Sequence, residues 1–162
     1  MGVSGCGKST VAGALSDRLG WEFAEGDDIH SAANVEKMHS GHPLTDDDRT
    51  PWLAEIAKWI SAHVAAGRSA IVTCSALKRT YRDVLRANAV TFVYLAGNRE
   101  QIAQRLASRE GHFMPATLLD SQFADLEPPG PDEQSITIGL GESAATQAEQ
   151  IVTALKLTPQ LR

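Results

Sequence analysis

A segment of eight residues near the start of the sequence, Gly2 to Ser9, constrains the fold more than any other. It reads GVSGCGKS and matches G-x-x-x-x-G-K-[ST] at every fixed position. Glycines allow the backbone conformations in which successive N–H groups turn toward one anion, and the following helix points its positive dipole end at the same place. The segment therefore predicts a phosphate-binding loop, in which Lys8 reaches the β- and γ-phosphates of a nucleoside triphosphate and the Ser9 hydroxyl binds Mg²⁺.

Composition narrows the classes of protein to which the chain can belong. The chain has 162 residues, of which 43% are apolar and 22% charged, as is ordinary for one globular domain. This excludes disordered, collagen-like and coiled-coil chains. No apolar run approaches the roughly 20 residues of a membrane span, and no signal-peptide pattern is present. The two cysteines are too few for a disulfide framework or a zinc site. We expect a cytoplasmic protein that contacts no membrane.

Charge is distributed unevenly along the chain. The net charge of −5 argues against a nucleic-acid partner. Between Lys78 and Arg109, however, seven basic residues accompany only two acidic ones. This stretch is either a pair of solvated helix faces or a set of cations that hold a small anionic ligand.

The apolar pattern predicts an α/β fold. Short continuous apolar runs alternate with longer helical patterns, which is typical of a parallel sheet covered on both faces. The expected strands are 21–25, 69–74, 90–96 and 135–140. The expected helices are 8–19, 31–39, 49–66, 76–88, 98–110, 116–126 and 142–157.

One expected strand has no counterpart. A phosphate loop normally follows a central strand, but here only Met1 precedes it. Either the strand is missing or the coding sequence begins further upstream, and the second explanation is favoured. Without that strand, its two neighbours would be left unpaired where it should lie, with backbone groups that need partners.

Acidic residues follow the first expected strand, in the segment Gly26-Asp27-Asp28-Ile29-His30. The carboxyl edge of the sheet is where open α/β folds bind ligands. Asp27 is a candidate to accept the proton of an attacking hydroxyl or to help hold Mg²⁺, and His30 to hydrogen-bond a polyol. The alternative is a helix cap beside an exposed histidine. The sequence has no N-K-x-D, and the best expected strand, 69–74, runs into Ser75 rather than into an acid. A small-molecule kinase therefore fits better than a GTP switch or a mechanical ATPase.

Several blocks together resemble the bacterial gluconokinases, small P-loop kinases related to shikimate and nucleoside-monophosphate kinases. The resemblance runs from Gly2 to about Glu133. It rests on GVSGCGKS (2–9), EGDDIH (25–30), NVEKMHSGHPLTDDDRTPWL (34–53), CSALKRTYRDVLR (74–86), FVYLAG (92–97) and RLASREGHFMPATLLDSQFADLEPP (105–129).

The resemblance implies ATP-dependent phosphorylation of D-gluconate at O6, giving 6-phosphogluconate and ADP. It implies a three-layer P-loop kinase sandwich with a parallel sheet in the order 2-3-1-4-5. It also implies one domain over the whole chain, 1–162, with a lid at about 109–127 over the ATP. Mg²⁺ is the implied metal and a homodimer the implied assembly.

Matching positions assign the residue roles. Lys8, Asp27 and Arg109 are the catalytic candidates, and Ser9 and Asp27 the candidates for Mg²⁺. The nucleotide-binding candidates are Gly2, Val3, Ser4, Gly5, Cys6, Gly7, Lys8, Ser9, Thr10, Arg105 and Arg109. The gluconate-binding candidates are Asp27, His30, Arg49, Lys78 and Arg82, of which Arg49 and Arg82 can each grip a carboxylate through two parallel N–H bonds.

Alternatives stay open at this point. One is a kinase for another small acceptor, such as shikimate or a nucleoside monophosphate. Another is a non-catalytic nucleotide-binding chain, if the first strand is truly absent. Cys6 is either an oxidation-prone thiol or a small space-filling residue, and Asp46, Asp47 and Asp48 form either part of the site or a solvated acidic turn.

Overall fold

The computed structural model describes residues 1–29, 32–87, 89–108 and 116–160. The strands are β1 Glu22–Glu25, β2 Ala70–Thr73, β3 Phe92–Ala96 and β4 Ser135–Gly139. The helices are α1 Lys8–Leu19, α2 Ala32–His39, α3 Asp46–Ala65, α4 Arg79–Leu85, α5 Arg99–Ala107, α6 Ala116–Asp125 and α7 Ala144–Leu155. A short 3₁₀ helix, η1, covers Gly26–Ile29. The four expected strands and seven expected helices are therefore confirmed, with shifted ends.

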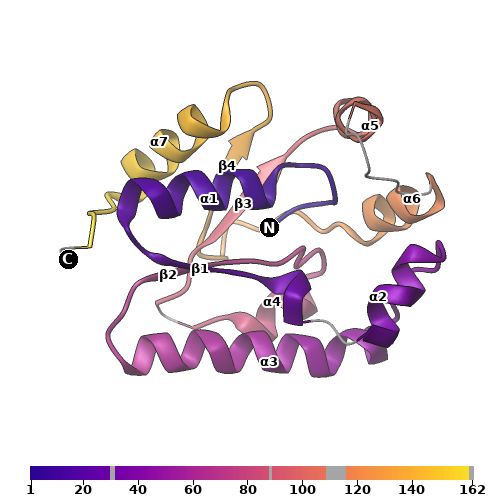
Figure 1. Cartoon of the computed structure of the whole chain (residues 1–162), viewed down its shortest axis with the longest axis horizontal. Coiled ribbons are helices and arrows are strands. Elements are labelled where there is room, and N and C mark those ends of the chain that lie inside the picture. Colours follow the sequence, from indigo (N-terminus) through magenta and orange to yellow (C-terminus); the bar gives the residue numbers. More distant parts are fainter. Residues whose placement is uncertain (30–31, 88, 109–115, 161–162) are drawn as a thin grey trace.

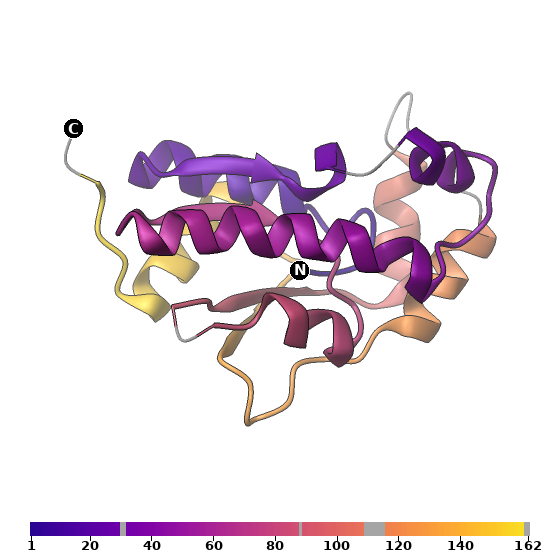
Figure 2. The same ribbon diagram turned by 90° about the horizontal axis from the view of Figure 1, so that it is seen from below.

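The elements form three layers (Figure 1). Helices α1 and α7 lie side by side on one face of the strands, and α3 and α4 lie on the other. Helices α2, α5 and α6 gather at the end of the molecule to which the phosphate loop points, and Figure 2 shows the same grouping from below. This end carries the candidate site.

The strands form two parallel pairs. Strand β1 pairs with β2, with Phe23 opposite Ile71, and β3 pairs with β4, with Tyr94 opposite Thr137. The predicted α/β class with parallel pairing is confirmed. The order 2-3-1-4-5 across the whole sheet stays a prediction.

Met1 and Gly2 lie between the two pairs. The Met1 amino group donates to the Val93 carbonyl at 2.6 Å, and the Met1 carbonyl accepts from the Leu95 N–H at 3.0 Å. The Gly2 N–H donates to the Ser75 carbonyl at 3.1 Å. These two residues therefore join β3 to the end of β2. Apart from the bonds of Met1 and Gly2, β2 and β3 have no backbone partner on their facing edges within the described residues. This agrees with the expectation that the neighbours of an absent strand are left unpaired.

A cavity of about 870 Å³ occupies the space between β2 and β3. Its lining is largely aliphatic and comes from both strands, from α1 and from α7, and includes Val11, Leu15, Val72, Val93 and Ile151. An apolar space between two strand edges is the environment that a central strand of a buried parallel sheet normally occupies.

Two apolar clusters hold the layers together. The first packs Leu15 of α1 and Ile151 of α7 against Leu95 of β3. The second packs Ile56 of α3 and Leu85 of α4 on the opposite face. No helix in the described part of the chain is long and apolar enough to cross a membrane.

Two helices begin elsewhere than predicted. Helix α3 begins at Asp46, because Thr45 and Asp48 form a capping box, and Pro51 therefore lies inside the helix. Helix α4 begins at Arg79 rather than Ala76, since Ala76 has a positive φ of 45° that a helix does not accommodate. The loop between β2 and α4 is longer as a result.

Candidate active site

The phosphate loop forms a tight turn before α1. The Cys6 N–H donates to the Val3 carbonyl at 3.3 Å, and Gly5 between them has a φ of 85°. Gly7, the residue that caps α1, has a φ of 95°. Only glycine adopts such angles without strain, which explains both positions. The loop thus curls over the amino end of α1, where backbone N–H groups and the helix dipole can bind an anion.

Two cations lie against this loop. Lys8 Nζ donates to the Gly2 carbonyl at 2.9 Å and to the Val3 carbonyl at 3.1 Å. Arg105 of α5 donates from Nη1 to the Cys6 carbonyl at 3.3 Å. The structure therefore brings both predicted residues to the loop. Ser9 and Thr10 are exposed beside it, and Arg109 lies outside the described residues, as does the first part of the predicted lid.

Cys6 is completely buried, with 0% of its surface exposed, inside the first apolar cluster. An oxidant would have no access to its sulfur. The oxidation-prone interpretation is therefore wrong, and Cys6 fills space beneath the loop.

The turn after β1 holds Asp27 at the carboxyl edge of the strands. The Gly26 N–H donates to Thr73 Oγ1 at 3.2 Å, and the Gly26 carbonyl accepts from Trp52 Nε1 at 2.8 Å. A Cβ at Gly26 would lie only 2.1 Å from the Thr73 carbonyl oxygen, so the turn fits no side chain there. Asp27 is exposed on this fixed turn. His30 lies outside the described residues.

Arg49 and Lys78 converge on one aromatic ring. The Arg49 guanidinium carbon lies 5.2 Å and Lys78 Nζ 5.6 Å from the centroid of the Tyr81 ring. Arg49 Nη1 donates to the Tyr81 hydroxyl at 2.9 Å, and that hydroxyl donates to Asp46. Asp125 of α6 lies 3.6 Å from Arg49 Nη1 and 3.9 Å from Lys78 Nζ. We call these five residues the Tyr81 cluster.

The cluster pairs cations with accessible carboxylates. The Asp46 side chain is 66% exposed and that of Asp125 27%. Hydrogen bonds from Tyr81 and then Lys78 lower the pKa of Asp46, and the bond to Asp46 raises the pKa of Lys78. Arg49 is buried and Lys78 partly exposed, but both contact carboxylates that water reaches, which is an arrangement that can accept a ligand carboxylate.

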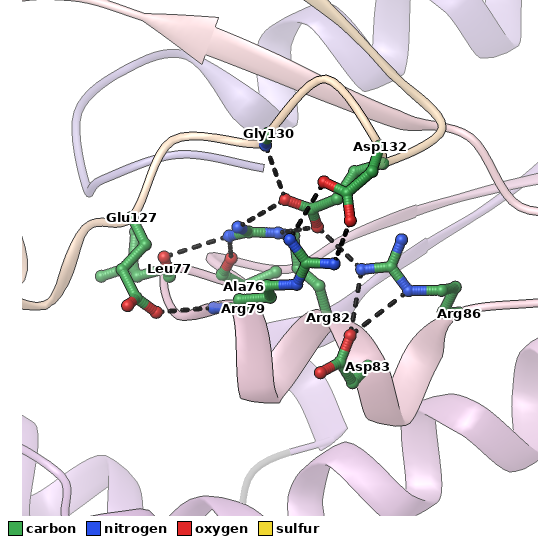
Figure 3. A network of polar contacts seen from close by, with 10 residues as sticks. Ala76, Leu77, Arg79, Arg82, Asp83, Arg86, Glu127, Gly130 and Asp132 are labelled. Carbon is green, nitrogen blue, oxygen red and sulfur yellow. Dashed lines mark hydrogen bonds and ion pairs between the residues drawn. The ribbon is translucent and has the colours of Figure 1, made fainter.

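Arg82 takes part in a different network, which we call the Glu133 clamp (Figure 3). Its Nε and Nη2 donate to the two carboxylate oxygens of Glu133 at 2.8 and 3.0 Å, and its Nη1 donates to the carbonyls of Ala76 and Leu77. Arg86 binds the same carboxylate at 2.8 Å. Arg82 and Glu133 are buried, with side-chain exposures of 1% and 0%.

This network corrects the role predicted for Arg82. Four of its five N–H groups are already taken, and no part of it faces solvent. Arg82 cannot grip the carboxylate of a ligand without giving up its two bonds to Glu133, which would leave that buried carboxylate with Arg86 as its charged partner. It instead fixes the loop around Ala76 to the loop around Glu133 and so sets where α4, with Tyr81, begins.

Sequence reasoning missed several residues of this region. No sequence pattern assigns a role to Tyr81, Gln122, Asp125 or Glu133, although the first three lie within the blocks that resemble the gluconokinases. Gln122 contacts the phosphate loop, since its Oε1 accepts from the Ser4 N–H at 2.6 Å. Tyr81 lies one helical turn beyond Lys78, so helical spacing could have indicated it, but no spacing links Gln122 to Ser4.

The chain is similar to several known proteins. A family model described as an AAA domain matches residues 1–129. A solved sugar kinase from a Janibacter species is 51% identical, with a TM-score of 0.92, and covers 98% of this chain and 93% of its own. The APS kinase of Mycobacterium tuberculosis, 18% identical with a TM-score of 0.67 over 97% of this chain and 95% of its own, shares the fold. Fold and loop together define a P-loop kinase.

Sequence identity to curated relatives narrows the class of P-loop kinases to one family. The gluconokinase of Gluconobacter oxydans is 56% identical over 140 residues, which cover 85% of this chain and 79% of the relative. The thermosensitive gluconokinase of Escherichia coli is 41% identical over 165 residues, which cover 100% and 88%. The chain belongs to the gluconokinase family.

Proposed function

We propose that the protein transfers the γ-phosphoryl group of ATP to O6 of D-gluconate, giving 6-phosphogluconate and ADP. The observation that carries the proposal is the position of α6. Through Gln122 it contacts the phosphate loop, and through Asp125 it contacts the cations of the Tyr81 cluster. The proposed polyphosphate site and the proposed carboxylate site therefore both border α6, about one helical turn apart.

The loop supplies the nucleotide half. Its backbone N–H groups and the amino end of α1 attract phosphate oxygens. Lys8, which now donates to two loop carbonyls, exchanges these neutral acceptors for the charged β- and γ-phosphates. Arg105 is held by the Cys6 carbonyl beside the same place and adds a second positive charge against the transferring group.

The Tyr81 cluster supplies the acceptor half. The gluconate carboxylate takes the place that the carboxylates of Asp46 and Asp125 hold, between Arg49 and Lys78. The Tyr81 ring beneath the two cations fixes their separation. A sugar acid anchored at its carboxylate extends its terminal hydroxyl toward the phosphate loop, which is the orientation that in-line transfer needs.

Asp27 is exposed on the turn after β1, at the carboxyl edge of the strands, and is the base of the proposed reaction. Its carboxylate orients the attacking hydroxyl and accepts its proton. The exposed oxygens of Ser9 and Asp27 are hard donors that suit Mg²⁺ together with phosphate oxygens. When bound, the metal neutralises charge on the phosphates. Within the described residues, no three His, Cys, Asp or Glu side chains form a metal site.

The test is ADP release in a coupled assay with ATP and a panel of acceptors that includes gluconate, shikimate and nucleoside monophosphates. We expect turnover with gluconate alone. The substitution Lys8→Ala lowers kcat by on the order of 10³-fold, because it removes a charge from the transition state. Lys58→Ala is the matched control, since Lys58 is exposed and pairs only with Glu55 in the described chain.

Two results would count against the proposal. Faster turnover of another acceptor would make the protein a kinase of that acceptor, and tight ATP binding without turnover would make it a nucleotide-binding chain. The expected homodimer and the cytoplasmic setting belong to the same proposal, and light scattering on the purified protein tests the first.

A further inference from the structure

Gln122 is held against a single residue of the phosphate loop. Its Oε1 accepts from the Ser4 N–H at 2.6 Å, and its Nε2 donates to Ser4 Oγ at 3.0 Å. Both ends of the amide are thus used on the backbone and side chain of Ser4. Gln122 is 8% exposed, so these bonds form where water competes little. The contact joins residues that are 118 positions apart in the chain.

The loop needs this partner. Ser4 is the second residue of the turn that the Cys6 N–H closes on the Val3 carbonyl, and Gly5 has the positive φ typical of the third residue of a type II turn. The closing bond of such a turn leaves the N–H of its second residue without a partner inside the turn. Gln122 supplies that partner from outside and so restricts the conformations of the loop.

Packing fixes the position from which Gln122 reaches the loop. Leu119 and Phe123 of α6 pack in the same apolar cluster as Val3 and Cys6 of the loop. The amide is therefore placed by a helix whose neighbouring side chains are anchored beneath the loop. Asp125, three residues further on the same helix, contacts the cations of the Tyr81 cluster.

We propose that Gln122 is a positioning residue for the nucleotide: its amide holds Ser4 so that the phosphate loop keeps the shape that receives the polyphosphate. The inference rests on the proposed function of the loop and adds a role for α6. Without Gln122, the loop must be ordered when the nucleotide binds, and part of the binding free energy is lost to that ordering.

The test measures ATP binding directly, with a fluorescent ATP analogue, and the steady-state parameters for both substrates. Gln122→Met keeps the length of the side chain and removes both hydrogen bonds. We expect the Kd and KM for ATP to rise about tenfold, while the KM for gluconate stays within about twofold. Ser4→Ala, which removes only the hydroxyl, raises the Kd for ATP about threefold.

A double-mutant cycle separates positioning from direct contact. If Ser4 acts through Gln122, adding Ser4→Ala to Gln122→Met weakens ATP binding no further. Ser121→Ala is the matched control, since its hydroxyl bonds to Leu118 within α6. A Kd for ATP that stays unchanged in Gln122→Met, or in Ser4→Ala if the first variant does not fold, overturns the inference. Because ATP binding is measured without gluconate, a protein that fails to phosphorylate gluconate overturns the proposed function but not this inference.

Discussion

The Tyr81 cluster and the Glu133 clamp use the same chemistry on two sides of one short helix. Each sets arginine and a second cation against carboxylates, and α4 contributes Tyr81 to one and Arg82 to the other. They differ in access to water. The Glu133 side chain is 0% exposed, whereas that of Asp46 is 66% exposed. A carboxylate in water can be exchanged for that of a ligand, while a buried one cannot leave without stranding its arginine.

Substitutions in the Glu133 clamp should have the largest effect, and that effect is on stability. Arg82→Met leaves the Glu133 carboxylate buried with only Arg86 as a charged partner, and we expect it to lower the free energy of unfolding by about 3–5 kcal/mol. Urea denaturation measures the loss. Arg79→Met is the control on the same helix, because its solvent-exposed pair with Asp132 should contribute little to stability. A stable Arg82→Met protein with a raised KM for gluconate would instead support the predicted role of Arg82 in gluconate binding.

Substitutions in the Tyr81 cluster should lower activity toward gluconate rather than stability. Arg49→Met removes a charged donor for the gluconate carboxylate, and we expect kcat/KM for gluconate to fall by about 10- to 100-fold. The KM for ATP stays within about twofold, because Arg49 does not contact the loop in the structure. Arg18→Met, on the exposed face of α1, is the control. An equal loss for ATP and gluconate would contradict the separation of the two halves.

Acid should weaken the clamp selectively. Hydrogen bonds, the strongest from Arg82, lower the pKa of Glu133 from 4.5 to about 2. Its contribution to stability is therefore present above pH 4.5 and is lost as the pH falls toward 2, since the unfolded chain takes up the proton first. The difference in unfolding free energy between the wild type and Glu133→Gln should shrink between about pH 5 and pH 3 in urea titrations. A difference that is constant with pH would refute the charged pair.

The smallest expected effect has the opposite sign. Asp125→Asn removes a carboxylate that competes for Arg49 and Lys78, and we expect the KM for gluconate to fall by about two- to threefold. Initial-rate measurements at saturating ATP detect the change. An increased KM would show that Asp125 orients the cations rather than occupying their ligand position.

The sequence predicts the local features of this fold well. The phosphate loop follows from glycine and lysine spacing, and the four strands follow from continuous apolar runs. These signals lie within a few neighbouring residues, where periodicity and turn chemistry determine the outcome. Nothing in the sequence marks the positive φ of Ala76, so the start of α4 is not predictable from it. The Ala76 carbonyl accepts from Arg82, which in turn binds Glu133 from a distant part of the chain.

The site was predictable only in part. Arg49, Lys78 and Arg82 carry the same charge in the sequence, and only their contacts in the folded chain separate them. The first two meet the carboxylates of the Tyr81 cluster, and the third meets the buried Glu133. The partner of Arg82, Glu133, is 51 residues away. Contacts at such separation depend on how the layers pack, which no short pattern encodes.

The cavity between β2 and β3 makes hydrostatic pressure an informative variable for this chain. The part of its volume of about 870 Å³ that water does not fill is lost when the layers separate, so compression favours the open states of the molecule. Because the lining joins α1 to the facing strands, the phosphate loop at the head of α1 shares in that response. A polypeptide strand seated in this space would oppose compression and stiffen the nucleotide end of the molecule at the same time.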